Sequence, residues 1–139
     1  MVWRLISNVW FSVVVNGASY GLFKSSQGLS QGDPLSPALF IIGAEVLSRS
    51  LNKLQSHQGF QGFRVPRGCP LVSHLGYADD VLVFSSASVK SLRLVKQVLS
   101  EYEAVFGQRI NERKSYFLVH PKVSPSKRLG IQRVTGFSY

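Results

Sequence analysis

The stretch VSHLGYADDVLVFS, residues 72–85, places two adjacent carboxylates, Asp79 and Asp80, between two short apolar runs. Each run is short enough for a β-strand, and the acid pair falls where the chain has to turn. A tight hairpin with two carboxylates at its tip offers the oxygen ligands that divalent cations prefer. Taken alone, an Asp-Asp pair is more typical of a turn in which acids form local hydrogen bonds. The rest of the sequence has to decide between these two interpretations.

Composition sets the bounds of the fold and of its partners. The 139 residues fit one domain or a piece of a larger one, and 45% of them are hydrophobic, enough for a core. Lysine and arginine number 16 against 7 acids, which gives a net charge of +9. Ten of these basic residues lie between Lys90 and Arg133. This balance favours a polyanionic partner such as nucleic acid, although a solubilising surface explains the charge equally well.

Cysteine usage and hydropathy exclude several classes of protein. Cys69 is the only cysteine, so no disulfide framework is expected, and His57, His74 and His120 lack the spacing of a zinc site. No window reaches the roughly 18 consecutive apolar residues of a membrane span. The apolar start of the chain is interrupted by polar residues and lacks the cleavage site of a signal peptide. We therefore expect an intracellular protein, in the nucleus or the cytoplasm, without a membrane partner.

Apolar periodicity and turn residues predict the secondary structure. Asn16-Gly17 between two β-rich runs is a strong hairpin signal. Ser36 and Pro37 suit the N-cap and first position of a helix, and Gly107 suits the end of another. The predicted elements are the end of a helix at 3–9, strands at 10–15 and 20–24, a helix at 37–55, an irregular stretch at 57–70, the hairpin around the acid pair, a helix at 89–106, a strand at 116–119 and a terminal loop.

This alternation of strands and helices favours an α+β fold. The economical arrangement is one antiparallel sheet with both helices packed on one of its faces. The second hairpin strand, residues 81–84 (VLVF), is apolar on both faces, as expected of a central strand. The tail contains Pro121 and Pro125 and shows no evident helix stop, so it is predicted to be a loop.

Sequence boxes on both sides of the acid pair change its interpretation. YADD, residues 77–80, resembles the YxDD box of reverse transcriptases. QGLSQGDPLSPALF, residues 27–40, resembles the QGxxxSP box in the form typical of LINE-type, non-LTR retrotransposons, especially plant ones. GQRINERKS, residues 107–115, is similar to the segment that follows the catalytic hairpin in those elements, and VNGASYGLF and VTGFSY also resemble that group. The boxes occur in family order, and the resemblance covers nearly the whole chain.

The resemblance implies a palm fold and Mg²⁺-dependent nucleotidyl transfer from a dNTP to a DNA primer on an RNA or DNA template. Two-metal chemistry of this kind uses carboxylates that hold the ions about 3.5–4 Å apart. Asp79 and Asp80 match the catalytic, metal-binding pair, and Asp79 is expected to be the ligand shared by both ions. Lys114 matches the basic position that protonates pyrophosphate, although a solvated loop lysine explains it equally well.

The resemblance also implies contacts with the nucleotide and the nucleic acid. Gln31 and Gly32 match positions that line the incoming nucleotide and the template, and Tyr77 matches a position near the primer terminus. Asp33 precedes a proline and is better explained as a turn acid than as a ligand.

The sequence departs from the family pattern in three places. The family's first catalytic aspartate lies on a strand well upstream of the QGxxxSP box, and no acid precedes Asp33 here. Ser30 stands where the family usually has arginine, and Phe106 stands where it usually has serine. Two of three carboxylates rarely hold two metals in the required geometry.

We therefore expect residues 1–139 to be a partial reverse-transcriptase domain that is inactive alone. It would be a palm fragment without the upstream catalytic strand, the thumb and the endonuclease. The alternatives are a non-enzymatic nucleic-acid-binding remnant and a decayed retrotransposon reading frame.

Overall fold

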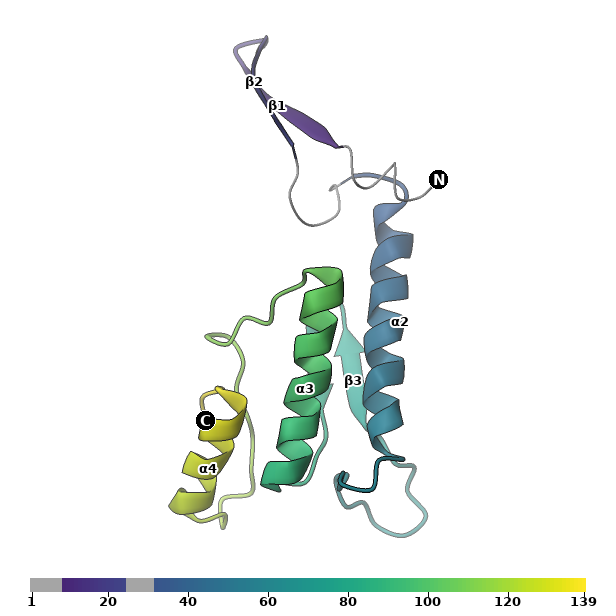
Figure 1. Cartoon of the computed structure of the whole chain (residues 1–139), viewed down its shortest axis with the longest axis vertical. Coiled ribbons are helices and arrows are strands. Elements are labelled where there is room, and N and C mark those ends of the chain that lie inside the picture. The colour runs from purple at the N-terminus through teal and green to yellow at the C-terminus, as the bar shows by residue number, and fades with distance from the viewer. Residues whose placement is uncertain (1–8, 25–31) are drawn as a thin grey trace. The chain divides into compact units, whose positions relative to one another are not determined.

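The computed structural model describes residues 9–24 and 32–139 (Figure 1). The chain divides into two compact units, Met1–Ile42 and Gly43–Tyr139, and each is described by itself. The helix expected at 3–9 falls almost entirely outside the described residues. No helix among the described residues is long and apolar enough to cross a membrane. The elements are β1 (Trp10–Val15), β2 (Ala18–Lys24), α2 (Ser36–Leu54), β3 (His74–Tyr77), β4 (Asp80–Val83), α3 (Val89–Phe106) and α4 (Pro125–Thr135).

The first unit contains the hairpin that Asn16-Gly17 predicts. β1 and β2 pair antiparallel around this dipeptide, whose φ angles of 51° and 83° place both residues in the left-handed region. Asparagine and glycine tolerate that region, which explains why this pair selects a tight turn. The register shifts between Phe11 and Val13, opposite Gly21 with its φ of 68°, as in a glycine-containing β-bulge. The hairpin predicted at 10–24 is confirmed.

Helix α2 begins after a turn that contains Asp33. The Asp33 Oδ1 accepts a hydrogen bond from the Leu35 N–H at 2.7 Å, and the Ser36 N–H donates to the Asp33 carbonyl at 3.1 Å. Asp33 is therefore a turn acid, as the sequence predicts. Pro37 follows in the first turn, where its missing N–H would have no helical partner. The helix predicted at 37–55 is confirmed within one residue at each end.

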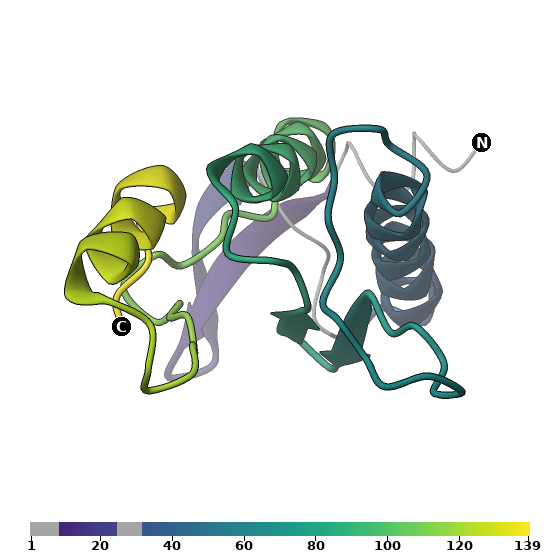
Figure 2. The same ribbon diagram turned by 90° about the horizontal axis from the view of Figure 1, so that it is seen from below.

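The second unit is built around α3, which runs over the predicted residues 89–106. The Ser88 side chain accepts a hydrogen bond from the Ser91 N–H at the start of the helix, and Gly107 ends the helix with a φ of 70°. In both views α3 lies between α2 and α4 (Figures 1 and 2). The buried large apolar side chains among the described residues are Leu51, Leu54 and Ile131, so the core is small.

Gly43 of α2 allows the close approach of two rings from α3. Tyr102 and Phe106 stack with their centroids 4.7 Å apart. A Cβ on Gly43 would lie 3.3 Å from the Tyr102 hydroxyl and 3.4 Å from the Phe106 ring. Burial raises the pKa of the Tyr102 phenol above its ordinary value of 10.0.

The C-terminal region differs from the sequence prediction. The loop predicted there is wrong, because Pro125–Thr135 forms helix α4, with Ser124 as N-cap and Gly136 as the left-handed C-cap at a φ of 78°. The strand predicted at 116–119 is also wrong. Its pairing in the described structure is a single bridge between Tyr116 and Ser138.

The strands do not form the single sheet expected from the sequence. Among the described residues, β1–β2 and β3–β4 are two separate two-stranded sheets, while the α+β class is confirmed. Val81 and Leu82 of β4 are 44% and 51% exposed, so the expectation of a covered central strand is wrong for this structure. An apolar run shows that both faces of a strand can be covered, but not that covering elements are present.

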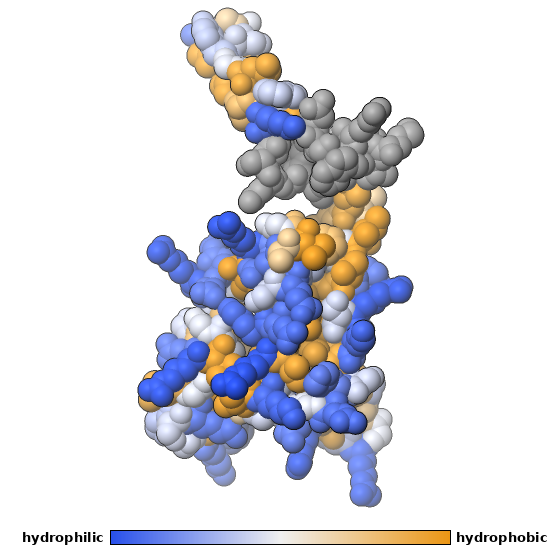
Figure 3. All heavy atoms as spheres, in the orientation of Figure 1, coloured by the Kyte–Doolittle hydropathy of each residue, from blue (hydrophilic) through white to orange (hydrophobic). Residues whose placement is uncertain are grey.

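Apolar surface also lies over the upper part of α2, where Ile41 and Ile42 are exposed (Figure 3).

Candidate functional site

The acid pair occupies the tip of the β3–β4 hairpin. The two strands pair antiparallel, and Tyr77 lies opposite Asp80 at the last pair before the turn. Ala78 and Asp79 are therefore the two turn residues, and Ala78 has a φ of 51°. Positive φ at the first central residue is typical of a type II′ turn, where glycine is the usual residue. The hairpin with both carboxylates at its tip is confirmed.

Both carboxylates at the tip are exposed. In the described part of the chain, neither the Asp79 nor the Asp80 carboxylate has a hydrogen bond or an ion pair, whereas the Asp33 carboxylate makes the local bond of a turn acid at 2.7 Å. If the acid pair served only as turn acids, their carboxylates would accept local hydrogen bonds of this kind. The described structure contains no such bond at the hairpin. The Tyr77 ring is 86% exposed and lies on the same sheet face as Asp80, because directly paired residues share a face.

The base of the hairpin is tied to α2 by four polar side chains, which we call the α2 clip. Ser73 Oγ donates to Asn52 Oδ1 at 2.6 Å and lies 2.8 Å from His74 Nδ1. The other ring nitrogen, His74 Nε2, lies 2.9 Å from Ser48 Oγ. Because the Ser73 hydroxyl proton points to Asn52, a neutral His74 carries its proton on Nδ1 and accepts from Ser48.

A second anchor, the serine cluster of Ser86, Ser88 and Ser91, ties the far end of β4 to α3. Ser91 is completely buried, and its Oγ accepts from the Gln61 N–H at 2.8 Å, from Ser88 Oγ at 2.9 Å and from Ser86 Oγ at 3.3 Å. The Ser86 N–H in turn donates to the Gln61 carbonyl at 3.0 Å. These bonds hold the irregular segment before β3 against the end of β4.

Both anchors were outside the sequence prediction. The run SSAS at 85–88, polar directly after an apolar strand, was a usable signal for the serine cluster. His74 has no such local signal, because its partner Ser48 lies 26 residues away in the sequence.

The other residues implied by the resemblance lie elsewhere. Lys114 is exposed in a turn in which Asn111 Oδ1 accepts from the Lys114 N–H at 3.3 Å. In the part of the chain that the structure describes, Lys114 has no bond to either hairpin acid. Gly32 belongs to the first unit and has a φ of 88°, a backbone angle that favours glycine. Gln31 lies outside the described residues. Within the second unit, the structure therefore brings together Tyr77, Asp79 and Asp80 at the hairpin tip, without a bond from Lys114 to either acid.

The donor set at the tip suits a hard divalent cation. Mg²⁺ is commonly held by one or two carboxylates, with waters and substrate phosphates as the remaining ligands. Asp79 and Asp80 supply two carboxylates. Across residues 9–24 and 32–139, no group of three His, Cys, Asp or Glu side chains gathers to hold a metal ion. The residues present therefore fit a site that substrate phosphates complete.

Comparison with known proteins points to one family. The family model described as "Reverse transcriptase (RNA-dependent DNA polymerase)" matches residues 2–133. An uncharacterized mitochondrial protein of Arabidopsis thaliana is 43% identical over 75 residues, which are 54% of this chain and 62% of that protein. No solved structure matches this chain.

Two retrotransposon proteins are also similar. The retrovirus-related Pol polyprotein from the type-1 retrotransposable element R2 of Popillia japonica is 32% identical over 84 residues, 60% of this chain and 13% of the polyprotein. The corresponding polyprotein from the type-2 element R2DM of Drosophila melanogaster is 28% identical over 122 residues, 88% of this chain and 11% of the polyprotein. The chain thus spans less than two thirds of each of these relatives. The matches confirm the resemblance inferred from the sequence boxes.

Proposed function

Because the chain belongs to the reverse transcriptase family, we propose that it is a fragment of an RNA-directed DNA polymerase that extends a DNA primer by two-metal nucleotidyl transfer. Enzymes of this family act on a template and primer with dNTPs and typically use divalent metal ions. One observation carries the proposal for this chain. Two adjacent exposed carboxylates, which have no side-chain partner among residues 9–24 and 32–139, form the tip of a hairpin inside the matched residues.

In this proposal the hairpin tip holds the metal. Asp79 would be the shared ligand and Asp80 would complete the coordination. Bound Mg²⁺ would activate the primer hydroxyl and neutralise the leaving pyrophosphate. Tyr77 would support the primer terminus, because its exposed ring shares a face with Asp80. Lys114 would donate a proton to the pyrophosphate.

The remaining assignments concern the assembled site. Gln31 and Gly32 would line the incoming nucleotide and the template. In a palm-like arrangement, the open edge of β4 would receive a further strand. Because the chain offers two carboxylates for chemistry that uses three, we propose that it is inactive alone.

Manganese binding tests the metal role, because Mn²⁺ replaces Mg²⁺ at oxygen sites and loses its sharp electron paramagnetic resonance signal when bound. We expect the chain to bind Mn²⁺ more tightly with a dNTP present, and the double variant Asp79→Asn, Asp80→Asn to lose this site. The matched control is Glu45→Gln, Glu101→Gln, which removes two exposed carboxylates that already have partners, Arg49 and Gln97. Equal loss in both variants would reject the hairpin as the metal site.

Primer extension tests the inactivity. We expect no incorporation by the 139-residue chain on a primed RNA template with Mg²⁺ and dNTPs. Incorporation that disappears in Asp79→Asn would overturn the claim of inactivity while supporting the polymerase assignment.

A second candidate function is non-enzymatic nucleic-acid binding, which the net charge of +9 favours. This function needs no metal. Binding to an RNA–DNA hybrid in EDTA that the Asp79→Asn, Asp80→Asn variant leaves unchanged, together with no Mn²⁺ site, would favour it over the first proposal. Absence of binding at low salt would reject it.

A further inference from the structure

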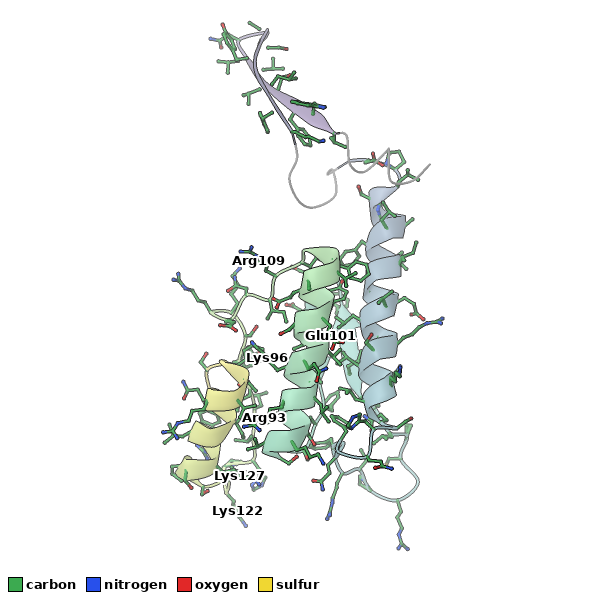
Figure 4. The ribbon with its side chains drawn as sticks, in the orientation of Figure 1. Arg93, Lys96, Glu101, Arg109, Lys122 and Lys127 are labelled. Carbon is green, nitrogen blue, oxygen red and sulfur yellow. The ribbon has the colours of Figure 1, made fainter. Side chains whose placement is uncertain are left out.

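Three cations gather where α3 and α4 begin. The two helices pack together, and both start at the same end of the second unit. Arg93 of α3, Lys127 of α4 and Lys122 of the preceding loop lie at this end (Figure 4). All three are exposed. We call Arg93, Lys122 and Lys127 the α3–α4 basic face, and the space-filling view shows hydrophilic side chains over the same helices (Figure 3).

Arg128 fixes the backbone of the loop that carries Lys122. Arg128 donates from Nη2 to the Pro121 carbonyl at 2.6 Å and from Nε to the Val123 carbonyl at 3.0 Å. Its guanidinium also lies over the Tyr139 ring, 4.5 Å from the centroid. Lys122 therefore sits between two carbonyls that Arg128 fixes against α4. A cation presented on ordered backbone loses less conformational entropy on binding than one on a free loop.

The charge of the face is not neutralised from within. In the described part of the chain, Arg93, Lys122 and Lys127 have no carboxylate partner, whereas Lys96 pairs with Glu112 at 2.7 Å. Glu101 is the next acid along α3, eight residues from Arg93 and thus about 12 Å away along the helix axis. The positive ends of two helix dipoles add to this potential, although the side-chain cations carry it.

A shallow groove of about 320 Å³ lies between the starts of the two helices. Leu92, next to Arg93, and Lys127 are among the residues that line it. Of the three cations, Lys127 lines the groove itself, while Arg93 and Lys122 lie at the same end of the two helices (Figure 4).

We propose that the α3–α4 basic face binds the phosphate backbone of nucleic acid without reading its sequence. The inference rests on the proposed function, since it names a second contact with the same partner, on elements other than the catalytic hairpin. Guanidinium and ammonium groups are the side chains that neutralise phosphates, and arginine can do so with two bonds. Neutralising a phosphate releases counterions, so the contact predicts a defined salt dependence.

The test is the salt dependence of binding to a fluorescein-labelled 20-base-pair RNA–DNA hybrid, measured by anisotropy in EDTA. The triple variant Arg93→Ala, Lys122→Ala, Lys127→Ala is compared with the control Lys53→Ala, Arg64→Ala, Arg67→Ala. The control removes the same charge from three exposed residues outside this face. Circular dichroism checks that both variants fold, and Arg93→Lys keeps the charge of its position.

The loss of three phosphate contacts makes the negative slope of log K against log [salt], where K is the association constant, shallower by about 2.7. The affinity in 0.1 M salt falls on the order of 100-fold. We expect this change in the basic-face variant, a much smaller one in the control, and near wild-type binding in Arg93→Lys. Equal effects of the two triple variants, or no binding of the wild type at low salt, would overturn the proposal. So would tighter, face-dependent binding to phosphatidylserine vesicles or to a poly-glutamate peptide than to the hybrid. This binding assay contains EDTA and therefore does not depend on the metal site. A negative result would reject the basic face and leave the proposed function to be judged by the manganese test.

Discussion

Replacement of Ser91 by alanine should loosen the base of the acidic hairpin. The Ser91 Oγ is buried and accepts two short hydrogen bonds, from the Gln61 N–H at 2.8 Å and from Ser88 Oγ at 2.9 Å. A hydroxyl oxygen has two lone pairs, so these two bonds count fully and the 3.3 Å bond from Ser86 adds little. At roughly 1 kcal/mol for each bond, the loss is about 2 kcal/mol in the free energy of unfolding.

The control for this substitution is Ser100→Ala on the same helix. Ser100 is exposed, so both variants gain the same helix propensity of about 0.5 kcal/mol and differ only in the buried bonds. In thermal unfolding followed by circular dichroism, we expect Ser91→Ala to melt about 10 °C below Ser100→Ala. Hydrogen exchange at Gln61 should also speed up in Ser91→Ala alone. Equal melting temperatures would refute the reasoning that the serine cluster anchors the hairpin.

The remaining predictions concern backbone strain, helix packing and one titration. Ala78→Gly should raise the free energy of unfolding by about 0.5–1 kcal/mol in urea denaturation. Glycine removes the strain of the left-handed backbone, about 1–2 kcal/mol, and this exceeds the cost of its greater freedom in the unfolded chain. A loss of stability would contradict the strained turn. Gly130→Ala, with open space around its Cβ, should gain about 1 kcal/mol, whereas Gly43→Ala should gain less because its Cβ meets Tyr102 at 3.3 Å; the reverse order would contradict the packing. Burial raises the pKa of Tyr102, so above pH 10.0 the unfolded state loses this proton first and stability falls as pH rises toward the folded pKa. Tyr102→Phe should therefore lose less stability than the wild type between about pH 9 and pH 11, measured by urea unfolding. An equal loss in both proteins would argue against a raised pKa of Tyr102.

Local signals predict the elements that carry their own turn chemistry. Asn16-Gly17 places the first hairpin, and Gly107 ends α3 where the sequence predicts. Helix α4 carries the same kind of signal in Ser124-Pro125 and Gly136, so its helix was readable from the sequence although it is predicted there as a loop. The loop is predicted from Pro121 and Pro125, but Pro125 occupies the first turn of the helix, where proline is tolerated.

Features that depend on tertiary contact could not be predicted. The Gln61–Ser91 bond joins residues 30 positions apart, and no periodicity encodes it. For β4, apolar residues on both faces predict cover, yet Val81 and Leu82 are exposed and, among the described residues, β4 pairs with β3 alone. The pattern around Asp79 and Asp80 places them correctly at the hairpin tip. Two short apolar runs flank the acid pair, so the chain has one place to turn.

The central claim is that the acid pair at the tip of the β3–β4 hairpin is a metal-binding centre. Paramagnetic broadening of amide NMR signals by Mn²⁺ with a dNTP tests it on the ¹⁵N-labelled chain. We predict that the amide signals of Tyr77, Asp79 and Asp80 broaden at the lowest Mn²⁺ concentrations, and that Asp79→Asn, Asp80→Asn abolishes the effect. Sharp hairpin signals while amides elsewhere broaden, or broadening that survives in the double variant, would contradict the account.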